Sequence, residues 1–192
     1  MSLLGEGDSR ELVRTTFASI LQKMTPAELM VALHTEETSL KPTIEGECSC
    51  LTQLIFADPI AIGMCFQMTT VFRSDVLANA MQRIADLPAL PMIFMRTIIQ
   101  AVTTYKSLGP FVANYVLPKL IAKKIWTNPQ LWDGFIRLAR RIAPASFGAL
   151  VQLPKEWLRD VVEKQPALKQ GLKGFLSGKP GTKEVLIEVS DV

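Results

Sequence analysis

The sequence predicts an all-α fold of irregular, HEAT-like antiparallel helical hairpins, an α-solenoid or bundle with about nine or ten helices. Proline punctuates the chain regularly, because Pro91, Pro110 and Pro129 follow one another at intervals of nineteen residues. Each stands near the start of a segment whose apolar residues recur with the helical period, and proline is well tolerated in a first helical turn. Two such units span about 38 residues, which approaches the length of a HEAT repeat.

The N-terminal part of the chain predicts two short helices. Ser9 is placed to cap a helix over residues 10–23, whose apolar residues follow the helical period. The segment Thr25-Pro26-Ala27-Glu28 is a stronger signal, because it combines a capping threonine, a proline at the first helical position and the glutamate of a capping box. It predicts a second helix over residues 26–34.

The rest of the chain predicts a series of helices, most of which begin beside a serine, an asparagine or a proline. Ser74 and Asn128 are placed as caps, and Pro118 should kink or split the helix in which it lies. The predicted helices cover residues 75–86, 91–105, 110–124, 129–142, 146–152, 154–164 and 166–176.

Charge is distributed unevenly along the chain. Residues 1–87 contain 6 Lys and Arg against 11 Asp and Glu, a net charge of −5, whereas residues 88–176 contain 13 against 4, a net charge of +9. Residues 177–192 carry a net charge of −1. A positive half of this kind is typical of a protein that meets acidic protein or RNA, and a solvated basic surface without a partner explains the charge equally well.

The sequence also predicts which classes the protein does not belong to. The N-terminus has no apolar core, so we expect no secretory signal peptide. The longest run without charge, residues 59–72, has 14 residues and is shorter than the roughly 18 that a membrane-spanning helix needs. Cys48, Cys50 and Cys65 form no disulfide framework and favour a reducing compartment. Cys48 and Cys50 have no second pair to complete a zinc site, so we predict no metal and no cofactor.

No familiar catalytic motif is present in the sequence. Phosphate-binding glycine loops and the H-E-x-x-H zinc motif are absent, and no nucleophile elbow surrounds a serine. His34 is the only histidine, and nothing around Glu36 and Glu37 suggests a pocket that raises their pKa. We therefore predict a binding module that is not an enzyme. An enzyme that uses His34 or the cysteines stays open as a weaker alternative.

The candidate binding surface lies on the basic half of the chain. Lysines close one predicted helix, arginines close the next, and two tryptophans flank the turn between them. The candidate residues are Lys119, Lys123, Lys124, Trp126, Trp132, Arg137, Arg140 and Arg141. Tryptophan beside arginine is typical of an interface hot spot. The same charges also complement helix C-termini, and we expect at least one of the two tryptophans to lie in the core. Aromatic residues among basic ones also suit single-stranded RNA, which is the alternative partner.

Several separated segments agree in order and spacing with one known family. They are Thr25-Pro26-Ala27-Glu28-Leu29, Phe72-x-Ser74-Asp75-Val76-Leu77, Leu90-Pro91-Met92, Met95-Arg96-Thr97-Ile98-Ile99-Gln100, Ile125-Trp126, Leu131-Trp132-x-Gly134-Phe135-Ile136, Pro144-x-Ser146-Phe147 and Leu150-x-x-Leu153-Pro154. Together they resemble the C-terminal domain of symplekin over about residues 9–176. The segments that begin at Ala101 and Lys124 are most similar to those of fungal members.

The resemblance implies a nuclear scaffold without catalytic activity, which acts in the cleavage and polyadenylation of pre-mRNA 3′ ends. The expected partners are the metallo-β-lactamase-type endonuclease of that machinery and its inactive paralogue, through their C-terminal regions. The phosphatase contact of symplekins belongs to an N-terminal domain that this sequence does not contain. We therefore do not expect that contact here.

We predict three parts in the chain. Residues 1–8 have no periodicity and are expected to be disordered, residues 9–176 form the helical domain that the resemblance covers, and glycine and proline at the start of residues 177–192 predict a flexible tail. Residues 46–60 are an atypical insertion, because they interrupt a helix of the family pattern. Two explanations stay open for these fifteen residues: a short in-frame intron retained in the coding sequence, or a genuine loop.

Overall fold

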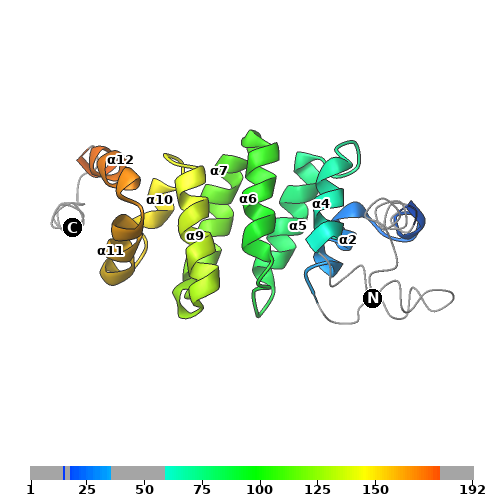
Figure 1. Ribbon diagram of the computed structural model, residues 1–192, viewed down its shortest axis with the longest axis horizontal. Coiled ribbons are helices and arrows are strands. Elements are labelled where there is room, and N and C mark those ends of the chain that lie inside the picture. The colour runs from blue at the N-terminus through cyan, green and yellow to red at the C-terminus, as the bar shows by residue number, and fades with distance from the viewer. Residues whose placement is uncertain (1–14, 16–17, 36–58, 178–192) are drawn as a thin grey trace, which may run out of the picture. The chain divides into compact units, whose positions relative to one another are not determined.

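The computed structural model describes residues 15, 18–35 and 59–177, and every regular element in these ranges is a helix (Figure 1). The described residues contain ten α-helices, which confirms the predicted all-α class. The predictions for Cys48, Cys50 and the Glu36-Glu37 pair, for residues 46–58 of the insertion at 46–60 and for both chain ends lie outside these ranges. The proposed domain boundaries stay a prediction.

The chain divides into two compact units, Met1–Phe94 and Met95–Val192. The helices of the first unit are α2 (Pro26–Ala32), α4 (Pro59–Gln67) and α5 (Ser74–Asp86). The second unit contains α6 (Phe94–Thr104, which begins one residue earlier), α7 (Gly109–Phe111), α8 (Leu117–Ala122), α9 (Pro129–Arg141), α10 (Phe147–Leu150), α11 (Lys155–Lys164) and α12 (Pro166–Ser177).

In the first unit, α2 begins with the predicted capping box. The Thr25 hydroxyl accepts a hydrogen bond from the Glu28 N–H at 3.3 Å, and the Glu28 carboxylate accepts one from the Thr25 N–H at 2.9 Å. Both bonds satisfy N–H groups that a helix end leaves without a partner. α2 packs against α5. The largest fully buried side chains of this unit include Leu29, Met30, Phe72, Leu77, Met81 and Ile84.

The start of α5 differs from its prediction. Ser74 is the first helical residue, and the capping position belongs to Arg73, whose backbone is extended and whose side chain forms no capping hydrogen bond. Arg73 instead pairs with Asp75 at 2.9 Å. The expectation that Ser74 caps this helix was therefore wrong, because a cap must stand one residue before the first helical turn.

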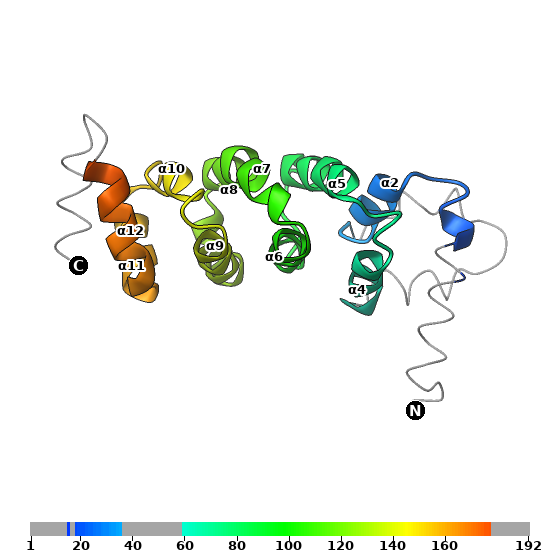
Figure 2. The ribbon, with the colours of Figure 1, turned by 90° about the horizontal axis from the view of Figure 1, so that it is seen from above.

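In the second unit, the helices form two rows. α6, α9 and α11 lie in one row, and α7, α8 and α10 lie in the other (Figure 2). Phe147 of α10 meets Phe175 of α12 with ring centroids 5.7 Å apart. Helices that alternate between two rows are the arrangement expected of HEAT-like hairpins.

The prolines act as predicted at two positions and differently at a third. Pro129 begins α9, and the predicted disruption around Pro118 is confirmed, because a five-residue π-helical turn over Val112–Val116 separates α7 from α8. Proline offers no N–H to the carbonyl four residues before it, and that carbonyl belongs to the π-helical turn. Pro91, by contrast, precedes α6. Its carbonyl accepts from the Phe94 N–H at 3.1 Å, so a turn comes before the helix and the predicted start at residue 91 was wrong.

One glycine permits the close approach of α6 and α9. A Cβ atom added to Gly134 would lie 2.7 Å from the Cβ of Met95 and 2.9 Å from its Cγ. Such distances fall well inside van der Waals contact, and the Met95 Cβ is held by the backbone of α6. The two helices therefore pack at this distance only because position 134 has no side chain.

Replacing Gly134 with alanine should destabilise the protein by about 1–3 kcal/mol, because it overpacks the contact with Met95. Chemical denaturation followed by circular dichroism measures this difference. Gly174 in α12 is the matched control, since a Cβ there meets nothing within 4 Å. Alanine at position 174 should raise the free energy of unfolding by about 0.5–1 kcal/mol. Equal effects at the two positions would contradict the close contact.

Candidate protein-interaction site

The residues predicted to meet a partner all lie in the second unit, on one helical hairpin. Lys119 belongs to α8, Lys123 is the residue that caps its C-terminal end, and Lys124 follows. Trp126 lies in the short 3₁₀ helix η3 (Ile125–Thr127), and the remaining candidates belong to α9. The candidates therefore lie on consecutive elements of the chain, but their environments differ strongly from one another.

The orientation of α9 follows from its cap and its apolar pattern. Asn128 caps the helix as predicted, and its Oδ1 accepts from the N–H groups of Gln130 at 3.1 Å and Leu131 at 3.3 Å. The buried face consists of Leu131, Trp132, Phe135, Ile136, Leu138 and Ala139. The exposed residues are Pro129, Gln130, Asp133, Arg137, Arg140 and Arg141. The arginines therefore face solvent, whereas Trp132 faces inward.

All three tryptophans of the chain belong to one cluster (the tryptophan cluster, Trp126, Trp132 and Trp157). Trp126 and Trp157 are stacked, with ring centroids 5.8 Å apart and planes 23° apart. Trp132 meets both of them edge-on, at 6.5 Å and 5.5 Å. The cluster connects η3, α9 and α11.

Trp132 is buried, with 2% of its surface exposed. Its indole N–H donates to the Asp160 carboxylate of α11 at 2.5 Å. This confirms the expectation that at least one tryptophan lies in the core. Trp132 is therefore removed from the candidate contact residues, because a side chain that is enclosed between two helices cannot touch a partner directly.

The Asp160 carboxylate also anchors a lysine. Lys164 lies 3.1 Å from Asp160 and 3.5 Å from Asp133 of α9. The hydrogen bond and the charge of Asp160 raise the pKa of Lys164 above its ordinary value. The lysine therefore stays charged, and its contact with Asp133 joins α11 to α9.

Trp126 and Trp157 are half-buried, so each presents part of its ring to solvent. Neither indole N–H has an acceptor among the described residues, in contrast to Trp132. Sequence reasoning missed Trp157. Its spacing to the buried Val161, four residues later in α11, was the available signal, because residues four apart share one face of a helix.

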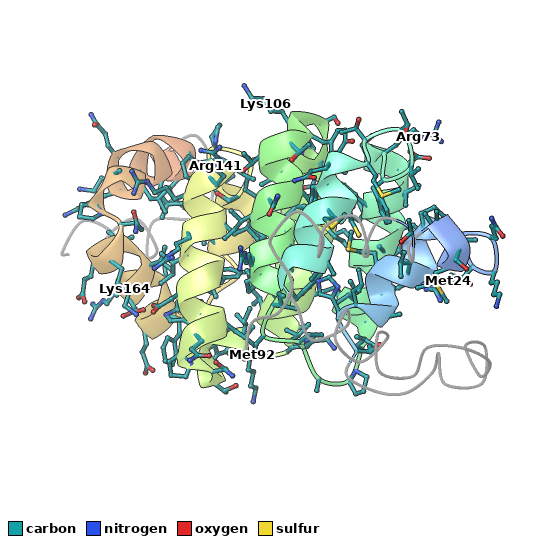
Figure 3. All side chains as sticks on the ribbon, turned by 45° about the vertical axis from the view of Figure 1, so that its right-hand side comes forward. Met24, Arg73, Met92, Lys106, Arg141 and Lys164 are labelled. Carbon is teal, nitrogen blue, oxygen red and sulfur yellow. The ribbon has the colours of Figure 1, made fainter. Side chains whose placement is uncertain are left out.

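The arginines differ in their contacts. Arg140 donates from Nη1 to the Gln165 side chain at 3.0 Å, which ties the end of α9 to the turn between α11 and α12. Arg137 and Arg141 are exposed, and within the described ranges neither forms an ion pair. They stand four residues apart and so project in nearly the same direction. Figure 3 places Arg141 at the end of α9 away from Lys164.

The lysines are also differently engaged. The Lys119 ammonium lies 5.5 Å from the centre of the Tyr115 ring, and that ring stacks on Phe111 at 5.6 Å. Lys124 is exposed and adopts a left-handed backbone, with φ 52° and ψ 51°, where α8 gives way to η3. Left-handed backbone is uncommon outside glycine. Lys124 therefore turns the chain as well as carrying a charge.

Of the groups considered for catalysis, His34 and Cys65 lie in the described ranges, and both are buried. His34 is 4% exposed, its Nδ1 lies 2.7 Å from the Met30 carbonyl, and burial lowers its pKa. Burial raises the pKa of the Cys65 thiol far above its ordinary value, which keeps the thiol protonated and unreactive. The described residues contain no cluster of three or more side chains that could bind a metal ion. Within the same ranges, no helix has the length and hydropathy to cross a membrane.

The family model described as "Symplekin tight junction protein C terminal" matches residues 3–165 of the chain. This match covers most of both compact units. No solved structure matches the chain.

Replacing Asp160 with alanine should destabilise the protein by about 1–3 kcal/mol, because the indole N–H of Trp132 loses its acceptor beneath the cluster. Urea denaturation measures this change. Glu163→Ala is the matched control on the same helix: Glu163 is exposed, and its loss should change stability by less than about 0.5 kcal/mol. A result in which both variants unfold at the same urea concentration would rule out the Trp132–Asp160 bond as a structural link.

Proposed function

Because the chain belongs to the symplekin C-terminal family, we propose that it is a non-enzymatic scaffold domain of the machinery that cleaves and polyadenylates pre-mRNA 3′ ends. The match to the family model over residues 3–165 is the observation that carries this proposal. The burial of His34 and Cys65 supports it, because neither is accessible for chemistry. The nucleus is the corresponding location.

The proposed partners are the metallo-β-lactamase-type endonuclease of that machinery and its inactive paralogue, through their C-terminal regions. The exposed arginines of α9 support a protein contact on the second unit. Its residues 95–177 contain 13 Lys and Arg and only 4 Asp and Glu. Of these four acidic residues, Asp133 and Asp160 are engaged by Lys164. A surface of this charge attracts an acidic partner and speeds their encounter.

RNA is the second candidate partner, and the same positive charge favours it. The two partners differ in how salt affects binding. Contacts to phosphate release counterions, so affinity falls steeply and linearly on a logarithmic scale of salt concentration. A protein interface with an apolar centre weakens less with salt and depends on its aromatic anchors.

Reversing Arg137, Arg140 and Arg141 to glutamate should weaken retention of the endonuclease and paralogue C-terminal regions at least about tenfold, because attraction becomes repulsion at each position. A pull-down with purified proteins at several salt concentrations measures this. Reversal of Lys106, Lys169 and Lys173 is the matched control, since it changes the net charge equally at other positions of the same unit.

Each outcome of this pull-down has a distinct meaning. Loss with the arginine variant alone supports a scaffold that uses α9. Equal loss with both variants would mean that retention depends only on the net charge of the unit. Unaffected retention would mean that the interface does not include the arginines of α9. Absence of any retention, together with salt-sensitive binding of RNA, would replace the scaffold with the RNA-binding alternative.

A further inference from the structure

We propose that the stacked pair Trp126–Trp157 and the exposed arginines Arg137 and Arg141 form one docking track for an extended acidic segment of a partner protein. The segment places an apolar residue, proline or leucine, on the tryptophan pair and acidic residues on the arginines. The inference rests on the proposed scaffold function and specifies the kind of partner segment that the scaffold binds.

The tryptophan pair has the properties of a prepared anchor site. Two half-buried indole rings lie stacked at 5.8 Å, so their exposed parts adjoin. Trp132 supports both rings edge-on and is itself held by Asp160. A rigid aromatic surface loses little conformational entropy when a ligand binds, which is why tryptophan is enriched in binding hot spots.

The hydrogen-bonding state of the pair favours an extended ligand. The indole N–H groups of Trp126 and Trp157 have no acceptor among the described residues, whereas that of Trp132 does. An extended or polyproline-type segment offers backbone carbonyls that have no internal partner. The carbonyls of a helix are already used within the helix. Proline-rich segments also bind aromatic grooves because their polyproline helix is already formed and loses little entropy on binding.

The arginines determine the charge of the other end of the track. Arg137 and Arg141 project from the exposed face of α9 and form no ion pair within the described ranges. Arg140 is turned toward Gln165 by its hydrogen bond and so contributes less. Guanidinium groups bind carboxylates and phosphates through two parallel hydrogen bonds, and in a protein segment the matching groups are carboxylates. The matching part of the ligand is therefore acidic.

The spacing between the two ends predicts the spacing within the ligand. Trp126 precedes α9 and Arg141 ends it, so the track runs along a helix of 13 residues, about 18 Å at 1.5 Å per residue. An extended chain advances about 3.3 Å per residue, so about five or six residues separate the apolar anchor from the acidic residue at Arg141, and about two fewer separate it from the one at Arg137. Between the ends, Lys164 neutralises Asp133, and uncharged residues suit this middle part.

The position of the carboxylates favours protein over RNA. Single-stranded RNA carries a phosphate beside every base, so its binding surfaces interleave aromatic and basic residues. Here the tryptophans and the exposed arginines of α9 lie at opposite ends of that helix. Asp160 lies against the cluster, and Asp133 lies along the track. Because Lys164 is paired with both carboxylates, the described region between the two ends offers no free positive charge that a phosphate backbone could follow.

Peptide phage display on the full chain tests the inference. Peptides should be selected that bind the unaltered chain and fail to bind Trp126→Ala. We expect them to share a proline or leucine followed, five or six residues later, by Asp or Glu. A synthetic peptide with that consensus should change the tryptophan emission of the unaltered chain, because all three tryptophans belong to the cluster. Its affinity should fall at least tenfold for the double variant Arg137→Glu, Arg141→Glu.

The control variant is Phe111→Ala, which removes a half-buried aromatic ring from another part of the second unit. It should leave peptide affinity within twofold of the unaltered chain. If Trp126→Ala does not fold, two other measurements decide the test. They are the change in tryptophan emission when the peptide binds the unaltered chain, and the affinity of the peptide for the double arginine variant.

Several results would overturn the docking track. One is a selection that yields no consensus, and another is a consensus peptide that binds the arginine variant as tightly as the unaltered chain. A third is an oligouridine that changes the tryptophan emission more strongly than any peptide and whose binding depends steeply on salt. The endonuclease regions could bind without changing the tryptophan emission and with equal affinity for Trp126→Ala and the double arginine variant. In that case the scaffold function stands and the track is wrong. If the consensus peptide binds and the endonuclease regions do not, the track stands and the proposed partner is wrong.

Discussion

The hydrogen bond from the Trp132 indole to Asp160 is the interaction on which the second unit depends. It joins α9 to α11 across 28 positions of the sequence. An indole N–H loses its hydrogen bond to water when it is buried, and the Asp160 carboxylate supplies the replacement acceptor. Trp126 and Trp157 rest against the ring that this bond holds. The contact that organises the core therefore also presents the aromatic pair at the surface.

On its other side, α9 is constrained by the absence of a side chain. Gly134 lets Met95 of α6 approach until no Cβ would fit between them. With α6 packed at Gly134 and α11 bound through Trp132, the helix has no rotation left that preserves both contacts. Arg137 and Arg141 face solvent for this reason. Their exposure follows from packing, and their lack of ion pairs within the described ranges leaves their charge available to a partner.

Local signals predicted the helices well, and contacts distant in sequence had no comparable signal. The Asn128-Pro129 cap and the disruption around Pro118 depend on backbone chemistry within a few residues, and both were confirmed. Pro91 was misplaced because a proline is compatible with the turn before a helix as well as with its first residue.

Trp132 and Asp160 show the limit of the sequence for the site. Their pairing needs the fold of the whole unit, so the sequence indicated a core tryptophan without its acceptor and missed Trp157. The candidate residues consequently separate into two groups that periodicity alone did not distinguish. Trp132 belongs to the buried group, which supports the surface from below, and Arg137 and Arg141 belong to the group of exposed charges.

Hydrogen–deuterium exchange of the full chain, with and without the endonuclease and paralogue C-terminal regions, tests the central claim most directly. The claim is that the surface organised by the tryptophan cluster receives a protein partner. Backbone amides of residues 125–141 and 155–164 should exchange more slowly in the complex, because the partner covers η3, α9 and α11. Slower exchange confined to the first unit, with residues 125–141 unchanged, would contradict the account.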